Sequence, residues 1–329
     1  MSSASSLPYQ LRPNKAVDRE LFLSLLARLS GSLNLEEYTY VGLGGPFLED
    51  FRLVHSRLGI AKMICVESEE AVHKRQVFNQ PIPSVECKHN TLEKFIDSTE
   101  FDNPVIIWFD YTDPKAVTKQ IIRFAETAMS VPLNSILRIT LNAQPGSLGV
   151  PDADEIQTPP DGEKDEDDHR PTLYEWRLAK FRDRMGKLFP SETAAADMDR
   201  TRYGRALLMA LKLAVSNELL SYPQRTVSWV LATHYADGQQ MTTATLLVLP
   251  NDSSLGELVK KWPFHSSPEA PLLLDMPVIS TRERLTLEAH GGKSAEMNYD
   301  FPISKLGEDP IESFKRFYRV FPHFSRVDL

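Results

Sequence analysis

Five short apolar runs, each followed by a segment with helical spacing, constrain the fold of this chain more than any other feature. The runs that we expect to form buried strands lie at 38–43, 61–67, 84–90, 104–110 and 135–142. The intervening segments carry apolar residues at the spacing of helices. Strands that alternate with helices pair in parallel through right-handed crossovers. We therefore predict an α/β fold with a doubly wound sheet, whose ligands bind beyond the carboxyl ends of the strands.

The pattern changes in the last third of the chain. Two β-rich runs, 226–235 and 242–250, are joined through Asp237 and Gly238. An Asp-Gly pair favours a tight antiparallel turn, so these runs predict a hairpin. We expect a mostly parallel sheet of seven strands that ends in this antiparallel hairpin.

The chain is expected to divide into three parts. These are an N-terminal helical segment, a sheet domain with an insertion at 145–199, and a C-terminal extension, with bounds 1–34, 35–250 and 251–329. The acidic segment 152–170 in the insertion holds nine Asp or Glu residues and almost no large apolar ones. That composition is typical of a flexible, solvated loop.

Composition disfavours several classes of function, although a local basic patch for nucleic acid stays open. The net charge of −8 argues against a generally basic surface for nucleic acid. The helical stretch 173–189 places three aromatic residues, Tyr174, Trp176 and Phe181, beside basic ones. This arrangement suits either a nucleotide-stacking surface or an ordinary surface helix with an apolar seam. No apolar run is long enough to span a membrane. The two cysteines, Cys65 and Cys87, are too few for a disulfide framework and predict reduced thiols in a cytoplasmic protein.

The first strand ends in glycines. Gly42, Leu43, Gly44 and Gly45 lead directly into a helix, an arrangement that presents backbone N–H groups to an anionic or nucleotide ligand. A dinucleotide fingerprint would need a third glycine where the chain has Phe47. A nicotinamide cofactor is therefore disfavoured, although an ordinary strand–helix turn stays open.

Polar residues also follow the second and third strands. Glu67 ends the second strand, where an acid can accept hydrogen bonds from a ribose diol. Asn90 and Thr91 follow the third strand and suit either an adenine edge or a helix cap.

The fourth strand is the clearest buried run and ends in Asp110, Tyr111 and Asp113. A carboxylate at this tip can act as a base, and an aromatic ring can orient a substrate. The alternative is a turn with solvated carboxylates, ended by Pro114.

The order of these pieces resembles the class I S-adenosylmethionine-dependent methyltransferases. Their glycine loop is matched by "YVGLGG", the acid of their second strand by Glu67, the polar residue after their third strand by Asn90, and the tip of their fourth strand by "FDYTDP". The hairpin at 226–250 is similar to their last two strands. The resemblance implies S-adenosylmethionine as cofactor, bound by residues 42–45, Glu67, Asn90 and Thr91. It also implies transfer of a methyl group to an acceptor, with oxygen as one candidate atom.

Two residues depart from the family pattern. Tyr40 stands where the family usually has an acid, and Pro46 replaces the third glycine of the loop. They favour an alternative in which the chain has lost catalysis and acts as a binding or regulatory subunit, with its aromatic C-terminus, 317–329, as a docking segment for a protein partner. The metal-dependent members carry an Asp-Asn pair after their fifth strand, and only Asn142 is present here, so no metal is expected.

Overall fold

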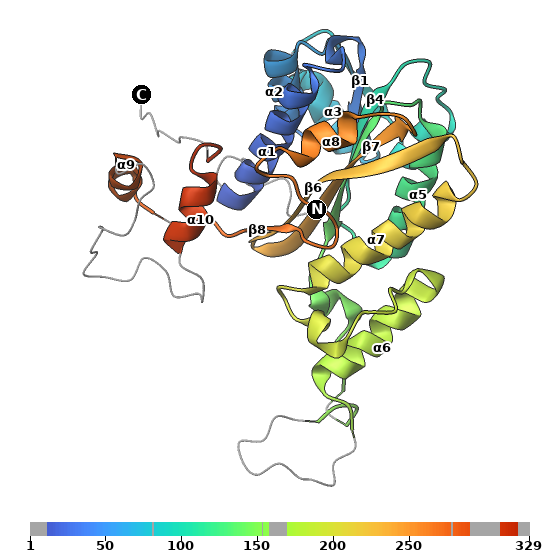
Figure 1. Ribbon diagram of the computed structural model, residues 1–329, viewed down its shortest axis with the longest axis vertical. Helices are drawn as coiled ribbons and strands as arrows, with labels where there is room; N and C mark the ends of the chain where they lie inside the picture. Colours follow the sequence, from blue (N-terminus) through green and yellow to red (C-terminus); the bar gives the residue numbers. More distant parts are fainter. Residues whose placement is uncertain are drawn as a thin grey trace.

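An eight-stranded sheet in the order β3-β2-β1-β4-β5-β7-β6-β8 forms the centre of the computed structural model (Figure 1). The structure describes residues 12–80, 82–152, 154–157, 170–277, 279–289 and 310–321. The strands are β1 (Thr39–Gly42), β2 (Lys62–Glu67), β3 (Val85–His89), β4 (Val105–Asp110), β5 (Ile136–Asn142), β6 (Arg225–Asp237), β7 (Gln239–Pro250) and β8 (Leu272–Leu274).

The helices connect the strands or extend the chain beyond them. They are α1 (Pro13–Leu29), α2 (Glu49–Leu58), α3 (Glu70–Asn79), α4 (Leu92–Asp97), α5 (Val117–Ser130), α6 (Leu173–Met185), α7 (Tyr203–Leu219), α8 (Leu255–Lys260), α9 (Thr281–Ala289) and α10 (Pro310–Phe317).

Strand pairing confirms the predicted fold class and adds one strand. Strands β1 to β5 pair in parallel, and β7 runs antiparallel to both β5 and β6. The additional strand, β8, pairs in parallel with β6 through three residues only. Such a short segment at a sheet edge carries no periodic signal of its own, because its strand conformation comes from its neighbour.

The sheet separates two hydrophobic cores. Helices α4, α5 and α7 pack on one face, and α1, α2 and α8 pack on the other. Strand β4 contributes to both, because successive side chains of a strand point to opposite faces. Ile106 and Trp108 belong to the core under α1, whereas Ile107 and Phe109 belong to the core under α5. The tip of β4 is thus held by burial on both sides.

Helix α1 begins at the carboxyl edge of the sheet, beside the β6–β7 turn. The carboxylate of Asp237 accepts hydrogen bonds from the backbone N–H of Lys15, at 2.7 Å, and of Asn14, at 3.4 Å. The Asn14 side-chain oxygen accepts from the backbone N–H of Met276, at 2.7 Å. An acid at the first turn of a helix is favoured by the helix dipole. These contacts fix where α1 starts relative to the strand ends.

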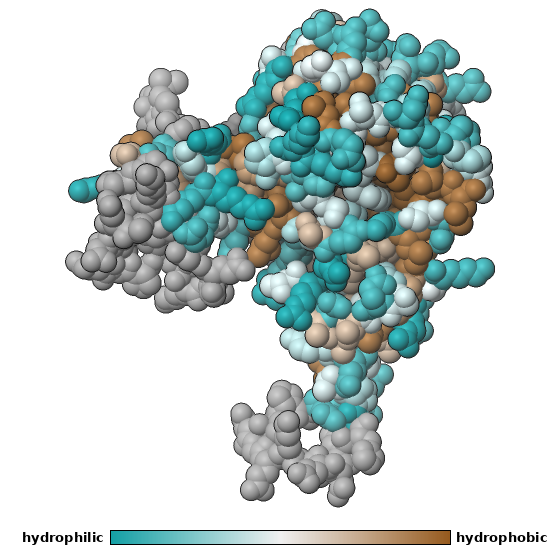
Figure 2. Space-filling model, in the orientation of Figure 1, coloured by the Kyte–Doolittle hydropathy of each residue, from teal (hydrophilic) through white to brown (hydrophobic). Residues whose placement is uncertain are grey.

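Helix α6 is half-buried. Trp176 and Phe181 are buried, and of the three aromatic residues noted in the sequence only Tyr174 is exposed. Thr172 and Glu175 form a capping box at its start. Figure 2 shows a mixed surface of hydrophilic and weakly hydrophobic residues over this helix. This packing favours the surface helix with an apolar seam over a row of exposed stacking rings.

Three further expectations concern the ends and loops. The acidic segment predicted to be flexible lies largely outside the described residues, as does most of the C-terminal docking segment. Both cysteines are free thiols. In the described part of the chain, no helix combines the length and the apolar character that crossing a membrane requires.

Candidate active site

The glycine loop after β1 adopts a backbone conformation that favours glycine. Gly44 and Gly45 have φ values of +66° and +53°, in the left-handed region that glycine adopts without strain. A Cβ atom on Gly44 would lie 2.6 Å from Cε2 of Phe51. The loop therefore passes too close to α2 for any side chain at this position.

Side chains of α3 donate hydrogen bonds to the backbone carbonyls of the loop. The Gln76 side-chain amide donates to the carbonyls of Leu43, at 3.1 Å, and Gly45, at 3.0 Å. Asn79 donates to the carbonyl of Pro46, at 2.8 Å. Gln76 is fully buried. These bonds give the loop a fixed shape, although Pro46 stands where a third glycine was expected.

The ends of β2 and β3 lie beside each other. Glu67 is half-buried, and its Oε1 accepts a hydrogen bond from the backbone N–H of Glu69, at 2.8 Å. The backbone N–H of Asn90 donates to the carbonyl of Glu67, at 2.9 Å. The Asn90 side chain accepts from the backbone N–H of Thr91, whose own hydroxyl caps α4. Thr91 thus caps α4, and Asn90 supports this cap at a position beside Glu67.

The three predicted residues at the tip of β4 point in different directions. Tyr111 lies in the core under α5, and its hydroxyl donates to Glu93, at 2.9 Å. Burial, together with the Glu93 carboxylate, raises the pKa of Tyr111. Asp113 is exposed and caps the 3₁₀ turn Pro114–Ala116 by accepting from the N–H of Lys115. Asp110 is half-buried and lies two residues beyond Trp108, on the same α1 side of the sheet.

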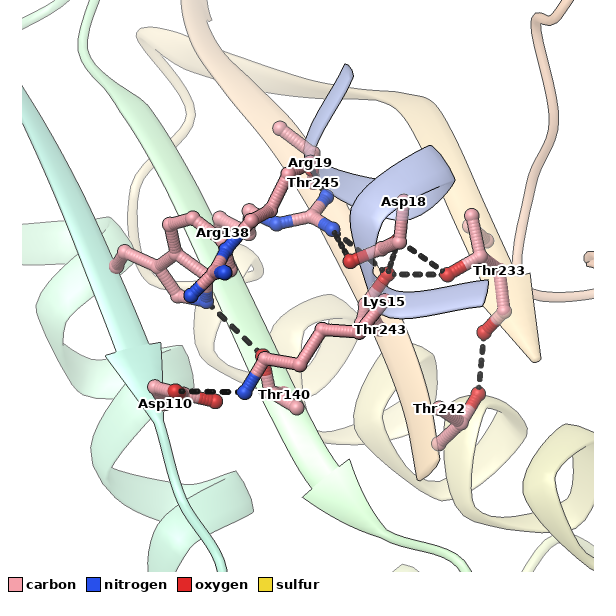
Figure 3. Close-up of polar contacts among 12 residues, drawn as sticks. Lys15, Asp18, Arg19, Asp110, Arg138, Thr140, Thr233, Thr242, Thr243 and Thr245 are labelled. Carbon is pink, nitrogen blue, oxygen red and sulfur yellow. Dashed lines mark hydrogen bonds and ion pairs between the residues drawn. The ribbon is translucent and has the colours of Figure 1, made fainter. Parts of the chain in front are cut away.

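Asp110 faces Lys15, a residue that belongs to none of the sequence motifs. Nζ of Lys15 lies 3.7 Å from Oδ2 of Asp110, and Figure 3 shows the lysine side chain extending from α1 to the end of β4. The other carboxylate oxygen, Oδ1, is buried and has no hydrogen-bond partner among the described residues. Burial lowers the pKa of Lys15, and the charge of Asp110 opposes this shift.

A second ion pair of α1 lies one turn further along the helix (Figure 3). Asp18 accepts a hydrogen bond from Arg138 on β5, at 2.6 Å, and both side chains are fully buried. Arg138 also donates to Thr243 and Thr245, and Thr233 donates to Asp18. The guanidinium lies over the rings of Phe22 and Trp108, 4.7 Å and 4.9 Å from their centroids.

The sequence contained one signal for these charged residues. Lys15, Asp18 and Phe22 are spaced by three and four residues, so they share one face of α1. Phe22 is buried, and charged residues in line with it are therefore expected to be buried as well. Their partners on β4 and β5 lie about a hundred residues away along the chain, and only the fold brings them together.

The described residues contain no group of three or more His, Cys, Asp or Glu side chains that could hold a metal ion. Asn142, the one residue that matched a metal-dependent pattern, donates to the carbonyl of Thr112, at 3.3 Å. Its side-chain oxygen accepts from the backbone N–H of Gln144.

Comparison with known proteins gives one match to a protein family. The family model described as "Putative O-methyltransferase" matches residues 7–329. No curated protein sequence matches the chain.

Solved structures with similar folds are distant in sequence. The complex of Trm1 from Pyrococcus horikoshii with S-adenosyl-L-methionine is 10% identical, with a TM-score of 0.49, over 88% of this chain and 74% of that one. A "putative O-methyltransferase" from Klebsiella pneumoniae is also 10% identical, with a TM-score of 0.36, over 74% and 91%. A "probable spermidine synthase" from Corynebacterium glutamicum is 13% identical, with a TM-score of 0.34, and the matched part covers 45% of this chain and about half, 53%, of that one.

Proposed function

The chain belongs to the O-methyltransferase family whose model it matches, as a divergent member of the class I S-adenosylmethionine-dependent methyltransferases, and from this premise we propose that it methylates an oxygen atom of an acceptor at the carboxyl edge of its sheet. The methyl donor is S-adenosylmethionine. It supplies a methyl group on a positively charged sulfur, which an oxygen nucleophile can take in a single displacement.

The residues at the edge fit this donor. The loop at 42–45 passes close to α2 in the left-handed conformation that its glycines allow, and α3 fixes its shape. Glu67 lies at the adjacent strand end, where its carboxylate would accept hydrogen bonds from the ribose hydroxyls. Asn90 and Thr91 adjoin Glu67 and would lie beside the adenine ring.

One observation at the tip of β4 carries the proposal. The buried Oδ1 of Asp110 has no hydrogen-bond partner among the described residues, although an unpaired buried acceptor is costly. Gly42 of β1 pairs with Trp108 of β4, so Asp110, two residues further on, lies level with the glycine loop. A carboxylate there can hold the acceptor hydroxyl and help to remove its proton. We place Asp110 at the reaction centre, with Tyr111 and Asp113 supporting the tip.

The alternative of an inactive, regulatory subunit rests on Tyr40 and Pro46. The Tyr40 ring is buried against Phe51, with ring centroids 5.1 Å apart, so the departure at this position lies in the core. The carbonyl of Pro46 is held by Asn79. Because neither residue disrupts the loop, we favour the active methyltransferase over this alternative.

Calorimetry with S-adenosylmethionine, S-adenosylhomocysteine and NAD tests the proposal. We expect both sulfur compounds to bind and NAD to fail. Replacing Glu67 by Ala should weaken binding by about 1–3 kcal/mol, because a charged acceptor for the ribose is lost. Glu69→Ala is the matched control, since Glu69 is exposed two residues away. Absence of binding at millimolar S-adenosylmethionine would contradict the proposed function, and an unchanged affinity of Glu67→Ala would remove Glu67 from the site.

A further inference from the structure

We propose that Lys15 is a catalytic residue that accepts the proton of the acceptor hydroxyl, while Asp110 first accepts a hydrogen bond from this hydroxyl and then stabilises the lysine cation that forms. This inference rests on the methyltransferase function proposed above. It gives two roles to two side chains that the fold brings together from α1 and β4.

The separation of the two side chains suits a bridging oxygen atom. Nζ of Lys15 and Oδ2 of Asp110 are 3.7 Å apart, which is too far for a direct hydrogen bond. An oxygen atom beside them can lie about 2.8 Å from both, since two such distances together exceed their separation. Oδ1 of Asp110, buried without a described partner, can accept the hydrogen bond of the bound hydroxyl before its proton passes to Lys15.

The fold holds Lys15 at this point from both sides. Its backbone N–H is bound by Asp237 at the β6–β7 turn. One turn further along α1, Asp18 is bound to Arg138 in the core. Because α1 is fixed before and after Lys15, the side chain reaches the edge of the sheet without a movement of the helix.

The charges around Lys15 favour a proton acceptor. Burial lowers its pKa most, and the neighbouring Arg19 and Arg12 lower it as well. Asp110 on β4 and Asp50 at the start of α2 act in the opposite direction. A sulfonium bound near Asp110 would add a positive charge to this site and lower the pKa of Lys15 further, since like charges disfavour protonation. The methyl donor would thereby favour the neutral amine form of Lys15 further.

The transfer is balanced in atoms and charge. The proton of the acceptor hydroxyl passes to the lone pair of Lys15 Nζ, the electron pair of that oxygen forms the bond to the methyl carbon, and the pair of the broken carbon–sulfur bond stays on sulfur. The positive charge thus moves from sulfur to the lysine ammonium, which lies beside the carboxylate of Asp110.

Proton release on ligand binding tests this inference without knowledge of the acceptor. We would titrate the full chain with S-adenosylmethionine and with S-adenosylhomocysteine by calorimetry, in pairs of buffers that differ in ionisation enthalpy, from about pH 6 to about pH 9. The sulfonium should release up to about one proton more than the uncharged thioether at the pH of the largest difference. Lys15→Met and Lys15→Arg should both abolish this difference, because neither side chain can lose a proton in this range.

Asp110→Asn provides a second readout. Loss of the carboxylate should lower the pKa of Lys15 and move the proton release to a lower pH. Equal proton release for both ligands at every pH, or a difference that persists in Lys15→Met, would overturn the role of Lys15 and leave the proposed function intact. Failure of the wild-type protein to bind S-adenosylmethionine would instead contradict the proposed function itself.

Discussion

Two of the ion pairs that helix α1 forms lie one turn apart and differ in distance, exposure and hydrogen-bond partners. Asp18 and Arg138 lie 2.6 Å apart, with side chains 1% and 0% exposed. Lys15 and Asp110 lie 3.7 Å apart, with side chains 13% and 21% exposed. Both oxygens of Asp18 have hydrogen-bond partners, whereas one buried oxygen of Asp110 has none that the structure describes.

The contrast separates a structural pair from a functional one. Two charges taken out of water are tolerated when geometry and additional hydrogen bonds offset their desolvation, which is the situation of Asp18 and Arg138. Lys15 and Asp110 are too far apart for a direct hydrogen bond to each other, and residues with a shifted pKa, such as Lys15, gather at functional sites. The same helix thus contributes Asp18 to an ion pair that stabilises the core and Lys15 to the proposed reaction centre.

The largest effect on stability is expected from Arg138→Met. The change leaves the charge of Asp18 buried opposite an apolar side chain, which should lower the free energy of unfolding by about 3–5 kcal/mol. Urea denaturation measures this loss. A loss below about 1 kcal/mol would show that the two pairs do not differ as their geometry indicates.

Lys15→Met should have a small effect of opposite sign. Burial lowers the pKa of Lys15 in the folded protein, so a proton on Lys15 destabilises the fold at every pH below that lowered value. This cost shrinks as the pH rises toward the ordinary lysine pKa of about 10.4. We therefore expect the variant to gain up to about 1 kcal/mol at neutral pH and to lose this advantage in alkaline solution. A loss of more than about 2 kcal/mol in urea would make Lys15 a structural residue like Arg138.

Local patterns were sufficient to predict most of the fold. The runs that became β1 to β5 are bounded by turns and helical spacing, and Asp237-Gly238 marks the hairpin directly. The strand β8 could not be predicted, because Leu272–Leu274 is defined only by pairing with β6. The burial of Arg138 could not be predicted either, because a charged residue in an apolar strand is expected to be buried only when its partner, here Asp18, is known.

The sequence predicted the site residues that lie at strand ends. It could not predict those that depend on contacts between residues far apart in the chain. The glycine loop, Glu67 and Asp110 stand at carboxyl ends that the sequence already marks. The direction of Tyr111 away from Asp110 follows from alternation along β4, which the sequence also contains. Lys15 could not be connected with Asp110, because 95 residues and the whole packing of α1 separate them in the chain.

Methyl transfer by Asp110→Asn and Asp113→Asn tests the central claim most directly. Each variant would be compared with wild type for folding, for affinity toward S-adenosylmethionine, and for transfer of a labelled methyl group to cell extract. We expect Asp110→Asn to fold and bind the donor while transfer falls by about 10²–10⁴-fold. Asp113→Asn should keep transfer, because its carboxylate only caps a turn. Wild-type protein that binds the donor but labels nothing in any extract would contradict this account and favour the regulatory subunit, as would an Asp110→Asn variant that transfers methyl groups as fast as wild type.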